Sequence, residues 1–355
     1  MTRMSTLSAM ITVLLLLSAA STLIADTPAL TDPPRHDFPR VGEYEVLCGD
    51  FHMHTVNSDG EQTTREKVLE AYNYGYDAIA ITDHGTARSY RLAASLARPL
   101  GLIVLRGAEM DIRDRPHLVV LNVSADYQPR NPRWAAGPGE ENAFYQDQMR
   151  EIRLAGGLIV YAHPHAGFTD AVQWGIAEGI VRGVEVKNAE VGSGYDTVES
   201  HGTYCYPFAF DWALDHDLAL FANSDSHNAR SGDQPVTLVL VKERSPSGVT
   251  EAIRELRTVA WFKGMLWGRE ELLSKLIEST VKVRRTPEGI LVENCGPVAL
   301  TAALTGVAGN LIEIEPYGEK LIGAEAGGDT ISVTWQNVWI SPRENLRSAF
   351  DVTTR

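Results

Sequence analysis

The chain has 355 residues, 44% hydrophobic and 22% charged, a composition that is typical of a globular protein and excludes a wholly disordered or fibrous one. Acidic residues outnumber Lys and Arg by 46 to 32, so the formal net charge is −14 at pH 7. Because proteins that follow a phosphate backbone usually present a basic face, this balance argues against a nucleic-acid partner. Roughly 200–250 residues can form one barrel domain, so the length leaves room for a small second domain.

Residues 1–25 carry the features of a secretory signal peptide. Arg3 precedes an apolar run centred on residues 11–17, and small residues follow it up to Ala25. The alternative is a membrane anchor, but the apolar run is shorter than the roughly 20 residues that a spanning helix needs. We therefore expect a periplasmic or secreted protein with no membrane attachment after signal cleavage. Residues 26–45 contain four prolines and are predicted to be a linker.

From residue 46 onward, short apolar runs alternate with helical patterns. The expected strands are 46–54, 77–82, 102–109, 117–123, 158–164, 183–188, 218–226 and 237–242, and the expected helices are 63–74, 87–98, 141–155, 206–216 and 247–257. Repeated β–α units with nearly continuous apolar strands indicate a parallel sheet covered by helices. About seven such units suit an α/β barrel over 46–268 better than an open sheet, and neither a dinucleotide glycine fingerprint nor a Walker loop is present.

The pattern changes at the helix-like segment 269–280, which is predicted to connect two domains. Beyond it, short strands are expected at 281–285, 289–294, 298–304, 310–315 and 330–335, separated by Gly, Pro and Asn turns. This arrangement predicts a small all-β domain over 281–355, mainly antiparallel and poor in chemically active side chains.

Histidine and acidic residues gather at the carboxyl ends of the predicted strands, where parallel barrels place their function. His117 is the exception, because it begins a strand, but a tight hairpin would bring it back towards Glu109. The candidate metal ligands are His52, His54, Asp59, His84, Glu109, His117, His163, Asp225 and His227. Imidazole and carboxylate ligands suit Zn, Mn and Fe, and three acids among nine ligands indicate more than one ion. A single HxH or TDH pattern is common by chance, so the prediction depends on their joint occurrence.

Three further residues are weaker candidates for contacts with substrate. His165, the second histidine of AHPH, is placed to contact substrate or donate a proton, or else to serve only as a rim residue. Lys187 and Asn188 end a predicted strand and would face the same mouth, although a lysine at a strand end is often simply solvated.

The motifs DFHMHTVNSDG, AITDHG, GAEM, AHPH and NSDSH resemble, in order and spacing, those of the PHP (polymerase and histidinol phosphatase) domain family. The resemblance implies a distorted (β/α)₇ barrel with a centre of two or three metal ions. By this resemblance one ion is held by His52, His54, Glu109 and Asp225, and a second by Glu109, His117 and His163. A third is held by Asp59, His84 and His227, although some members have histidine where this chain has Asp59.

The export signal and the β tail also resemble secreted phosphodiesterases of the Sb-PDE type. The expected activity is therefore metal-dependent hydrolysis of small organic phosphodiesters by a metal-bridging hydroxide. Glu109, Asp225 and His227 would hold the catalytic ions, and His165 is a candidate proton donor. One alternative is a phosphomonoesterase of the histidinol-phosphatase type, and another is a non-catalytic barrel that binds metal. The oligomeric state is left open.

Overall fold

The structure is a computed structural model that describes residues 33, 36–111, 116–129, 141–188, 205–304, 311–323 and 329–354. The predicted signal peptide and nine of the 20 residues of the predicted linker lie outside these residues. The continuous described chain begins at His36. It forms a short turn in which Val41 pairs with Tyr44, and the first strand starts at the next residue, Glu45.

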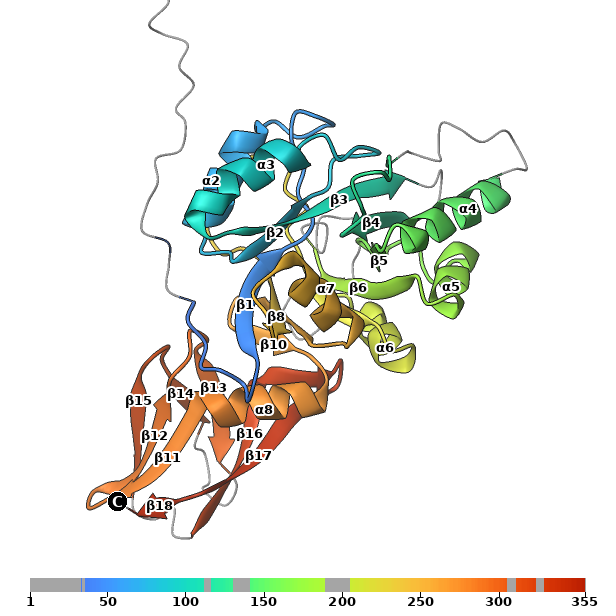
Figure 1. The fold of residues 1–355 in the computed structure, drawn as a ribbon. Coiled ribbons are helices and arrows are strands. Elements are labelled where there is room, and N and C mark those ends of the chain that lie inside the picture. Colours follow the sequence, from blue (N-terminus) through green and yellow to red (C-terminus); the bar gives the residue numbers. More distant parts are fainter. Residues whose placement is uncertain are drawn as a thin grey trace, which may run out of the picture.

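A curved sheet of eight strands forms the larger part of the molecule (Figure 1). Its strands are β1 (Glu45–Asp50), β2 (Ala78–Ile81), β3 (Ile103–Asp111), β4 (His117–Leu121), β5 (Leu158–Tyr161), β6 (Val181–Lys187), β7 (Ala219–Ala222) and β8 (Val236–Val241). The order in space is β8-β1-β2-β3-β4-β5-β6-β7. Strands β1 to β3 are parallel to one another, as are β5 to β7.

The parallel sheet that the β–α alternation predicts is interrupted at two strands. Strand β4 is antiparallel to both β3 and β5, and β8 is antiparallel to β1. Only five residues separate β3 from β4, and a parallel neighbour requires a crossover of a dozen or more. The same short connection forms the hairpin that was expected to return His117 to the site.

The sheet closes on itself as a distorted barrel, which confirms the predicted fold class. At the closing edge, the backbone N–H and C=O of Ala222 in β7 are hydrogen-bonded to the Thr237 hydroxyl in β8, at 3.0 and 2.9 Å. One buried cluster takes alternate side chains from the strands around the ring, among them Leu47, Leu105 and Val160. Phe51 and Phe221 meet edge to face within it, with ring centroids 5.9 Å apart. Because successive strand residues face opposite sides, such a cluster is the filled interior of a barrel.

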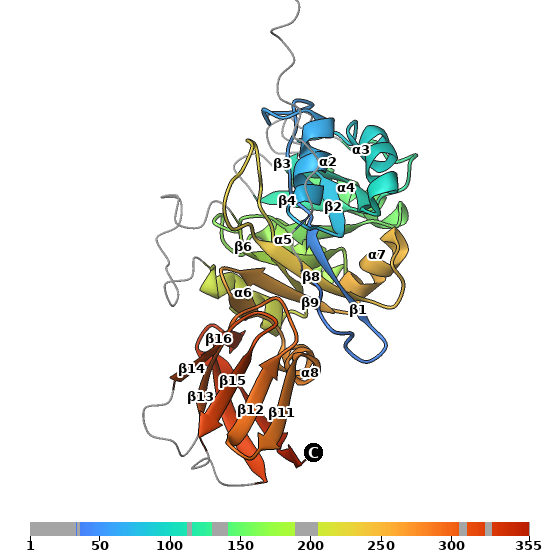
Figure 2. The same cartoon turned by 90° about the vertical axis from the view of Figure 1, so that its left-hand side faces the viewer.

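Helices cover the outside of this barrel (Figures 1 and 2). They are α2 (Thr64–Asn73), α3 (Tyr90–Ala97) with a following 3₁₀ turn (Arg98–Leu100), α4 (Glu141–Leu154), α5 (Asp170–Ala177), α6 (Pro207–Asp215) and α7 (Pro246–Arg254). The sequence analysis did not predict α5, which is one short, apolar segment with a glycine inside it. Its start is nevertheless set locally, because the Thr169 hydroxyl accepts a hydrogen bond from the Val172 N–H.

The C-terminal region is all-β beyond one helix, as predicted. The hairpin β9 (Thr258–Phe262) and β10 (Met265–Trp267) leads into α8 (Glu270–Thr280). The strands that follow are β11 (Val281–Thr286), β12 (Gly289–Asn294), β13 (Leu300–Leu304), β14 (Leu311–Ile314), β15 (Glu319–Gly323), β16 (Thr330–Ser341), β17 (Glu344–Asp351) and β18 (Thr353–Thr354). Strands β15, β12, β11 and β18 form a separate sheet, whereas β16 pairs in parallel with β10. The barrel sheet therefore continues without a break into the C-terminal region.

No helix among the described residues combines the length and apolar character that crossing a bilayer requires. The three cysteines, all within the described part of the chain, form no disulfide, and Cys48 and Cys205 are buried.

Candidate metal centre

The segments that follow β1 and β7 run side by side at the carboxyl end of the barrel. The His54 N–H donates to the Ser226 carbonyl at 3.0 Å, and the Asp225 N–H donates to the His52 carbonyl at 2.8 Å. Strand β1 ends at Asp50, so His52 and His54 stand just beyond the strand rather than within it. This backbone pairing places two histidines opposite the two ligand candidates of the β7 segment.

Four buried side chains converge into one compact group. The Nε2 atoms of His52 and His54 are 3.1 Å apart, and each lies 3.1 Å from Glu109 Oε2. The same two nitrogens lie 3.2 and 3.1 Å from Asp225 Oδ1. A tetrahedral zinc ion, at about 2.0–2.1 Å from its ligands, holds them roughly 3.3 Å from one another. The four atoms thus have the spacing of a tetrahedral cation site.

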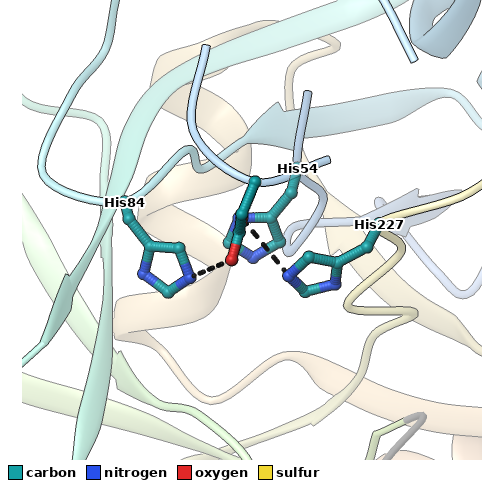
Figure 3. Close-up of side chains that lie close together, drawn as sticks. His54, His84 and His227 are labelled. Carbon is teal, nitrogen blue, oxygen red and sulfur yellow. Dashed lines mark ion pairs between the residues drawn. The ribbon is translucent and has the colours of Figure 1, made fainter. Parts of the chain in front are cut away.

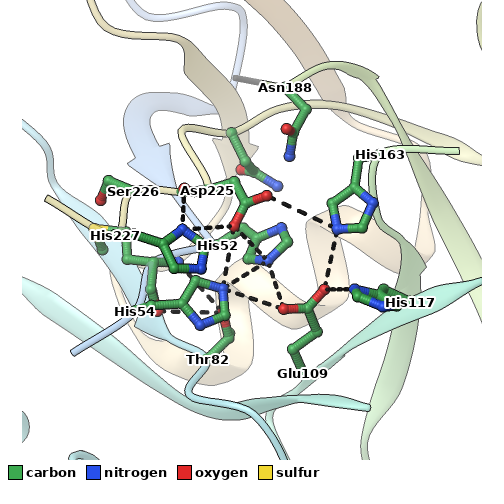
Figure 4. A network of polar contacts seen from close by, with 12 residues as sticks. His52, His54, Thr82, Glu109, His117, His163, Asn188, Asp225, Ser226 and His227 are labelled. Atoms are coloured by element: carbon green, nitrogen blue, oxygen red, sulfur yellow. Dashed lines mark hydrogen bonds and ion pairs between the residues drawn. The ribbon is translucent and has the colours of Figure 1, made fainter. Parts of the chain in front are cut away.

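The carboxylate of Glu109 connects this group to a second one (Figure 4). Its other oxygen, Oε1, lies 3.0 Å from His117 Nδ1 and 3.2 Å from His163 Nε2. In the β3–β4 hairpin Glu109 pairs with Val119, so His117 is its diagonal neighbour on the same face. One carboxylate therefore offers one oxygen to each of two ligand groups.

A third group lies nearer the solvent (Figure 3). The Asp59 carboxylate is 3.3 Å from His84 Nε2 and 3.4 Å from His227 Nε2. His54 reaches this group with its second nitrogen, Nδ1, which is 3.5 Å from Asp59 Oδ1. Asp59 is 53% exposed, whereas Glu109 is 1% exposed, so this group is the most open of the three.

Two of the nine candidates have a positive φ, which is uncommon for any residue other than glycine. His163 has φ of 23° and Asp225 has φ of 50°, a region that residues with a Cβ rarely adopt. Such conformations persist where the surrounding structure holds them, and they cluster at functional sites. Here the positive φ of Asp225 directs its side chain to the first group of ligands, and that of His163 directs its ring to the second.

The comparisons with known proteins agree with this geometry. Residues 50–135 match the PHP domain family. The chain contains a PHP domain. Relatives include DNA polymerase III PolC-type of Bacillus cereus, 34% identical over 89 residues, or 24% of this chain and 6% of that one. The corresponding protein of Streptococcus sanguinis is 32% identical over 106 residues, or 29% of this chain and 7% of that one. The chain therefore spans only a small part of the curated relatives it matches.

One solved structure matches nearly the whole chain. It is described as a two-domain protein containing a predicted PHP-like metal-dependent phosphoesterase, from Bacteroides vulgatus. The sequences are 24% identical, the TM-score is 0.75, and the match covers 91% of this chain and all of the other. The barrel and the C-terminal β region thus form a fold shared with that two-domain protein.

The structure adds Glu185, which the sequence analysis missed, to the PHP site. This fully buried carboxylate accepts hydrogen bonds from His52 Nδ1 and Asn223 Nδ2 on Oε1, both at 2.9 Å. Its Oε2 accepts from the His163 N–H and from Asn188 Nδ2, both at 2.7 Å. A carboxylate behind a metal-binding histidine fixes the ring so that the other nitrogen faces the ion. The signal in the sequence is an acid inside the apolar strand GVEVKN, one that needs a buried partner.

The helix α2 holds the loop that carries Asp225 and His227. The Lys67 ammonium is fully buried and donates to the Ser226 hydroxyl at 2.9 Å and to Glu70 Oε2 at 3.0 Å. Glu70 Oε1 in turn accepts from the Arg230 N–H at 2.8 Å. The Lys67–Glu70 ion pair therefore holds this loop at Ser226, between the two ligand candidates, and again at Arg230.

Electrostatics in the cluster favour bound positive charge. Burial disfavours charge on His54 and His163, but the neighbouring carboxylates of Glu109 and Asp225 outweigh it and raise the pKa of both rings to about 9. Burial likewise opposes ionisation of Glu109, yet His52, His117 and His163 hold its pKa well below the usual range. Without metal the two rings carry protons at neutral pH, so metal uptake must release protons as the rings become neutral ligands.

The residues present fit a divalent transition metal. His54 Nδ1 is buried and finds no hydrogen-bond partner, a costly arrangement that a cation at this atom would relieve. Mixed imidazole and carboxylate ligands suit zinc, manganese and iron. The structure brings all nine sequence-predicted candidates into these three groups.

The weaker candidates are placed differently. The groups open into a cavity of about 330 Å³ that His165 lines, stacked on His163 with ring centroids 5.1 Å apart. The structure does not bring Lys187 and Asn188 to this cavity. The Asn188 amide is turned to Glu185, and the buried Lys187 ammonium lies 4.7 Å over the Phe262 ring and donates to the Asn188 carbonyl. The pairing of β6 with β7 shifts register between Glu185 and Lys187, so regular alternation does not bring the Lys187 side chain to the face of Glu185.

Replacement of the shared carboxylate should remove more metal than replacement of the exposed one. We expect Glu109→Gln to lose the ions of two groups and Asp59→Asn to lose at most one, because only Glu109 contributes an oxygen to two groups. Metal counted per chain by mass spectrometry tests this expectation. Equal losses in the two variants would contradict the shared role of Glu109.

Glu185→Gln should weaken metal binding without removing a ligand. The amide nitrogen would face two donors where the carboxylate now accepts, so we expect metal affinity to fall about 10–100-fold. Chelator competition measures the affinity, and Glu178→Gln, at an exposed glutamate outside the barrel mouth, is the matched control. Unchanged affinity in Glu185→Gln would show that the orientation of His52 does not depend on this carboxylate.

Proposed function

We propose that this protein hydrolyses small organic phosphodiesters with the help of divalent metal ions held by the three groups. The observation that carries the proposal is the Glu109 carboxylate, with Oε2 among the first group of ligands and Oε1 in the second. Sites that share a carboxylate bring two cations close together, and this arrangement suits the clamping of a phosphoryl group. The fold shared with a PHP-like metal-dependent phosphoesterase supports the same chemistry.

Bound divalent ions supply Lewis acidity towards the phosphoryl oxygens and acidify a coordinated water. The Glu109 and Asp225 carboxylates would hold the bound cations by their negative charge. His227 lies beside Asp59 and Asp225, at the solvent side of the centre. The reaction adds water to phosphorus, breaks the bond to one ester oxygen and yields a phosphomonoester and an alcohol. His165, exposed on the cavity wall, is positioned to donate the proton that the leaving oxygen requires.

The room at the site is sufficient for a diester. The cavity of about 330 Å³ is open to solvent above the ligands and exceeds the volume of a phosphoryl group with one small substituent. The alternatives are a phosphomonoesterase of the histidinol-phosphatase type and a non-catalytic metal-binding barrel. The PolC-type relatives match only around this domain, and the net charge of −14 supports a small substrate rather than a nucleic acid.

Turnover assays on the metal-loaded protein separate these possibilities. With zinc, manganese or iron bound, we expect a higher kcat/KM for bis(p-nitrophenyl) phosphate than for p-nitrophenyl phosphate. His52→Ala and Asp225→Ala should each lower it at least about 100-fold, because each removes a ligand of the most buried group. His216→Ala, at a histidine outside the three groups, should keep the activity.

Faster monoester turnover would replace the diesterase proposal by the monoesterase alternative. Stoichiometric metal with no turnover of either ester, or of a single-stranded oligonucleotide, would favour the non-catalytic barrel. Full activity in His52→Ala with metal still bound would contradict the assignment of the centre itself.

We also propose that the chain is exported, on the basis of the signal-like residues 1–25. Expression in a Gram-negative bacterium should place the protein in the periplasm or the medium, with a new N-terminus near Ala20 or Ala25. Cell fractionation with N-terminal sequencing tests this, and an uncleaved cytoplasmic protein would contradict it.

A further inference from the structure

A second, larger cavity adjoins the metal centre. It has a volume of about 560 Å³, and its walls include Asn57, His84, Arg88, Tyr90, Arg91 and Arg106. His84 lines this cavity and also the cavity over the metal centre. The two spaces therefore lie next to each other and share one wall residue.

The charge of this cavity is opposite to that of the protein as a whole. Three arginines line it, and no Asp or Glu stands among its described lining residues. Arg106 is fixed by the chain, since it donates to the carbonyls of Ser124 and Tyr127 at 2.7 and 2.8 Å. Arg88 and Arg91 are exposed and form no ion pair with a described residue. Two guanidinium groups are thus available beside a third that is held in place.

The start of α3 adds to this positive potential. Arg88, Tyr90 and Arg91 belong to the first turn of the helix or directly precede it. Ser89, at the N-cap, does not cap the helix, because its hydroxyl donates to the buried carboxylate of Asp83. The Tyr90 N–H donates to the Ala87 carbonyl at 3.2 Å, so the start of α3 contributes mainly through the helix dipole, which favours an anion there.

We propose that this cavity binds a second anionic group of the substrate while the metal centre holds the scissile phosphodiester. Arg88 and Arg91 recognise the group, which is a terminal phosphate or carboxylate that the paired donors of a guanidinium match in shape and charge. The inference rests on the proposed phosphodiesterase activity and narrows its substrate class to diesters with an anionic arm. It also explains how a protein of net charge −14 attracts a polyanionic small molecule, because the local field at the site is positive.

A substrate series with one leaving group tests the proposal. The series consists of p-nitrophenyl ethyl phosphate diesters whose ethyl group ends in phosphate, carboxylate, hydroxyl or trimethylammonium. For the metal-loaded protein, kcat/KM should be about tenfold or more higher for one of the anionic arms than for the hydroxyl arm, mainly through KM. The better of the phosphate and carboxylate arms identifies the anion.

The double variant Arg88→Ala/Arg91→Ala should lose this preference and keep kcat/KM for the hydroxyl arm within about twofold of the parent. The matched control is Arg65→Ala/Arg98→Ala, which removes the same charge from two exposed arginines outside the cavity. An absent preference, or a preference that survives in the cavity variant, would overturn the proposal. A preference lost equally in the control would assign the effect to overall charge and overturn it as well.

A measurement without turnover separates failure of the cavity from failure of the proposed function. Inorganic phosphate should slow the modification of Arg88 and Arg91 by phenylglyoxal several-fold in the full-length protein, with no effect on Arg98, as read by peptide mass spectrometry. If phosphate protects Arg88 and Arg91 but the protein hydrolyses none of the diesters, the anion site is supported and the phosphodiesterase activity is rejected. Turnover of the diesters with no protection and no anionic preference would keep the diesterase and reject the anion site.

Discussion

The carboxylate of Glu109 is the interaction on which the rest of the site depends. It is 1% exposed and faces the ring nitrogens of four histidines at 3.0 to 3.2 Å. Burial of an ionised carboxylate is costly unless positive charge compensates it, so the cluster requires either protons on its rings or cations between them. The same carboxylate unites two groups of ligands, and this makes the centre one unit rather than several independent sites.

The ligands of this unit are held in position by buried side chains that contact them or their loops, chiefly Glu185 and Lys67. Glu185 collects four hydrogen bonds, from His52, His163, Asn188 and Asn223, and so orients ligands from both groups. Lys67 holds the loop of Asp225 and His227 from the opposite side. Below them the barrel interior is packed with apolar side chains, which gives the strand ends a rigid base. The centre is thus supported at its buried side and open to solvent at Asp59, His84, His117 and His227.

Two cavities share His84 as a wall residue, and their linings differ in chemistry. One is lined by metal-ligand candidates and His165, and the other by arginines. An acidic protein can in this way present a locally positive site, since bound cations and guanidinium groups outweigh the carboxylates nearby. The net charge of the chain therefore bears on long polyanions and says little about a small phosphoester.

The sequence by itself determined the β–α alternation, the β-rich C-terminal region and the nine ligand candidates. These depend on apolar runs and on residues that directly follow them, both of which are local properties of the chain. The tertiary structure decided the antiparallel β4 and β8, the pairing of β10 with β16, and the roles of Glu185, Lys67, Lys187 and Asn188. The roles of Glu185 and Lys67 are set by partners far away in the sequence, such as His52 for Glu185 across 133 residues and Ser226 for Lys67 across 159. A buried polar side chain is defined by the donors and acceptors that surround it, and only the closed barrel brings those groups together.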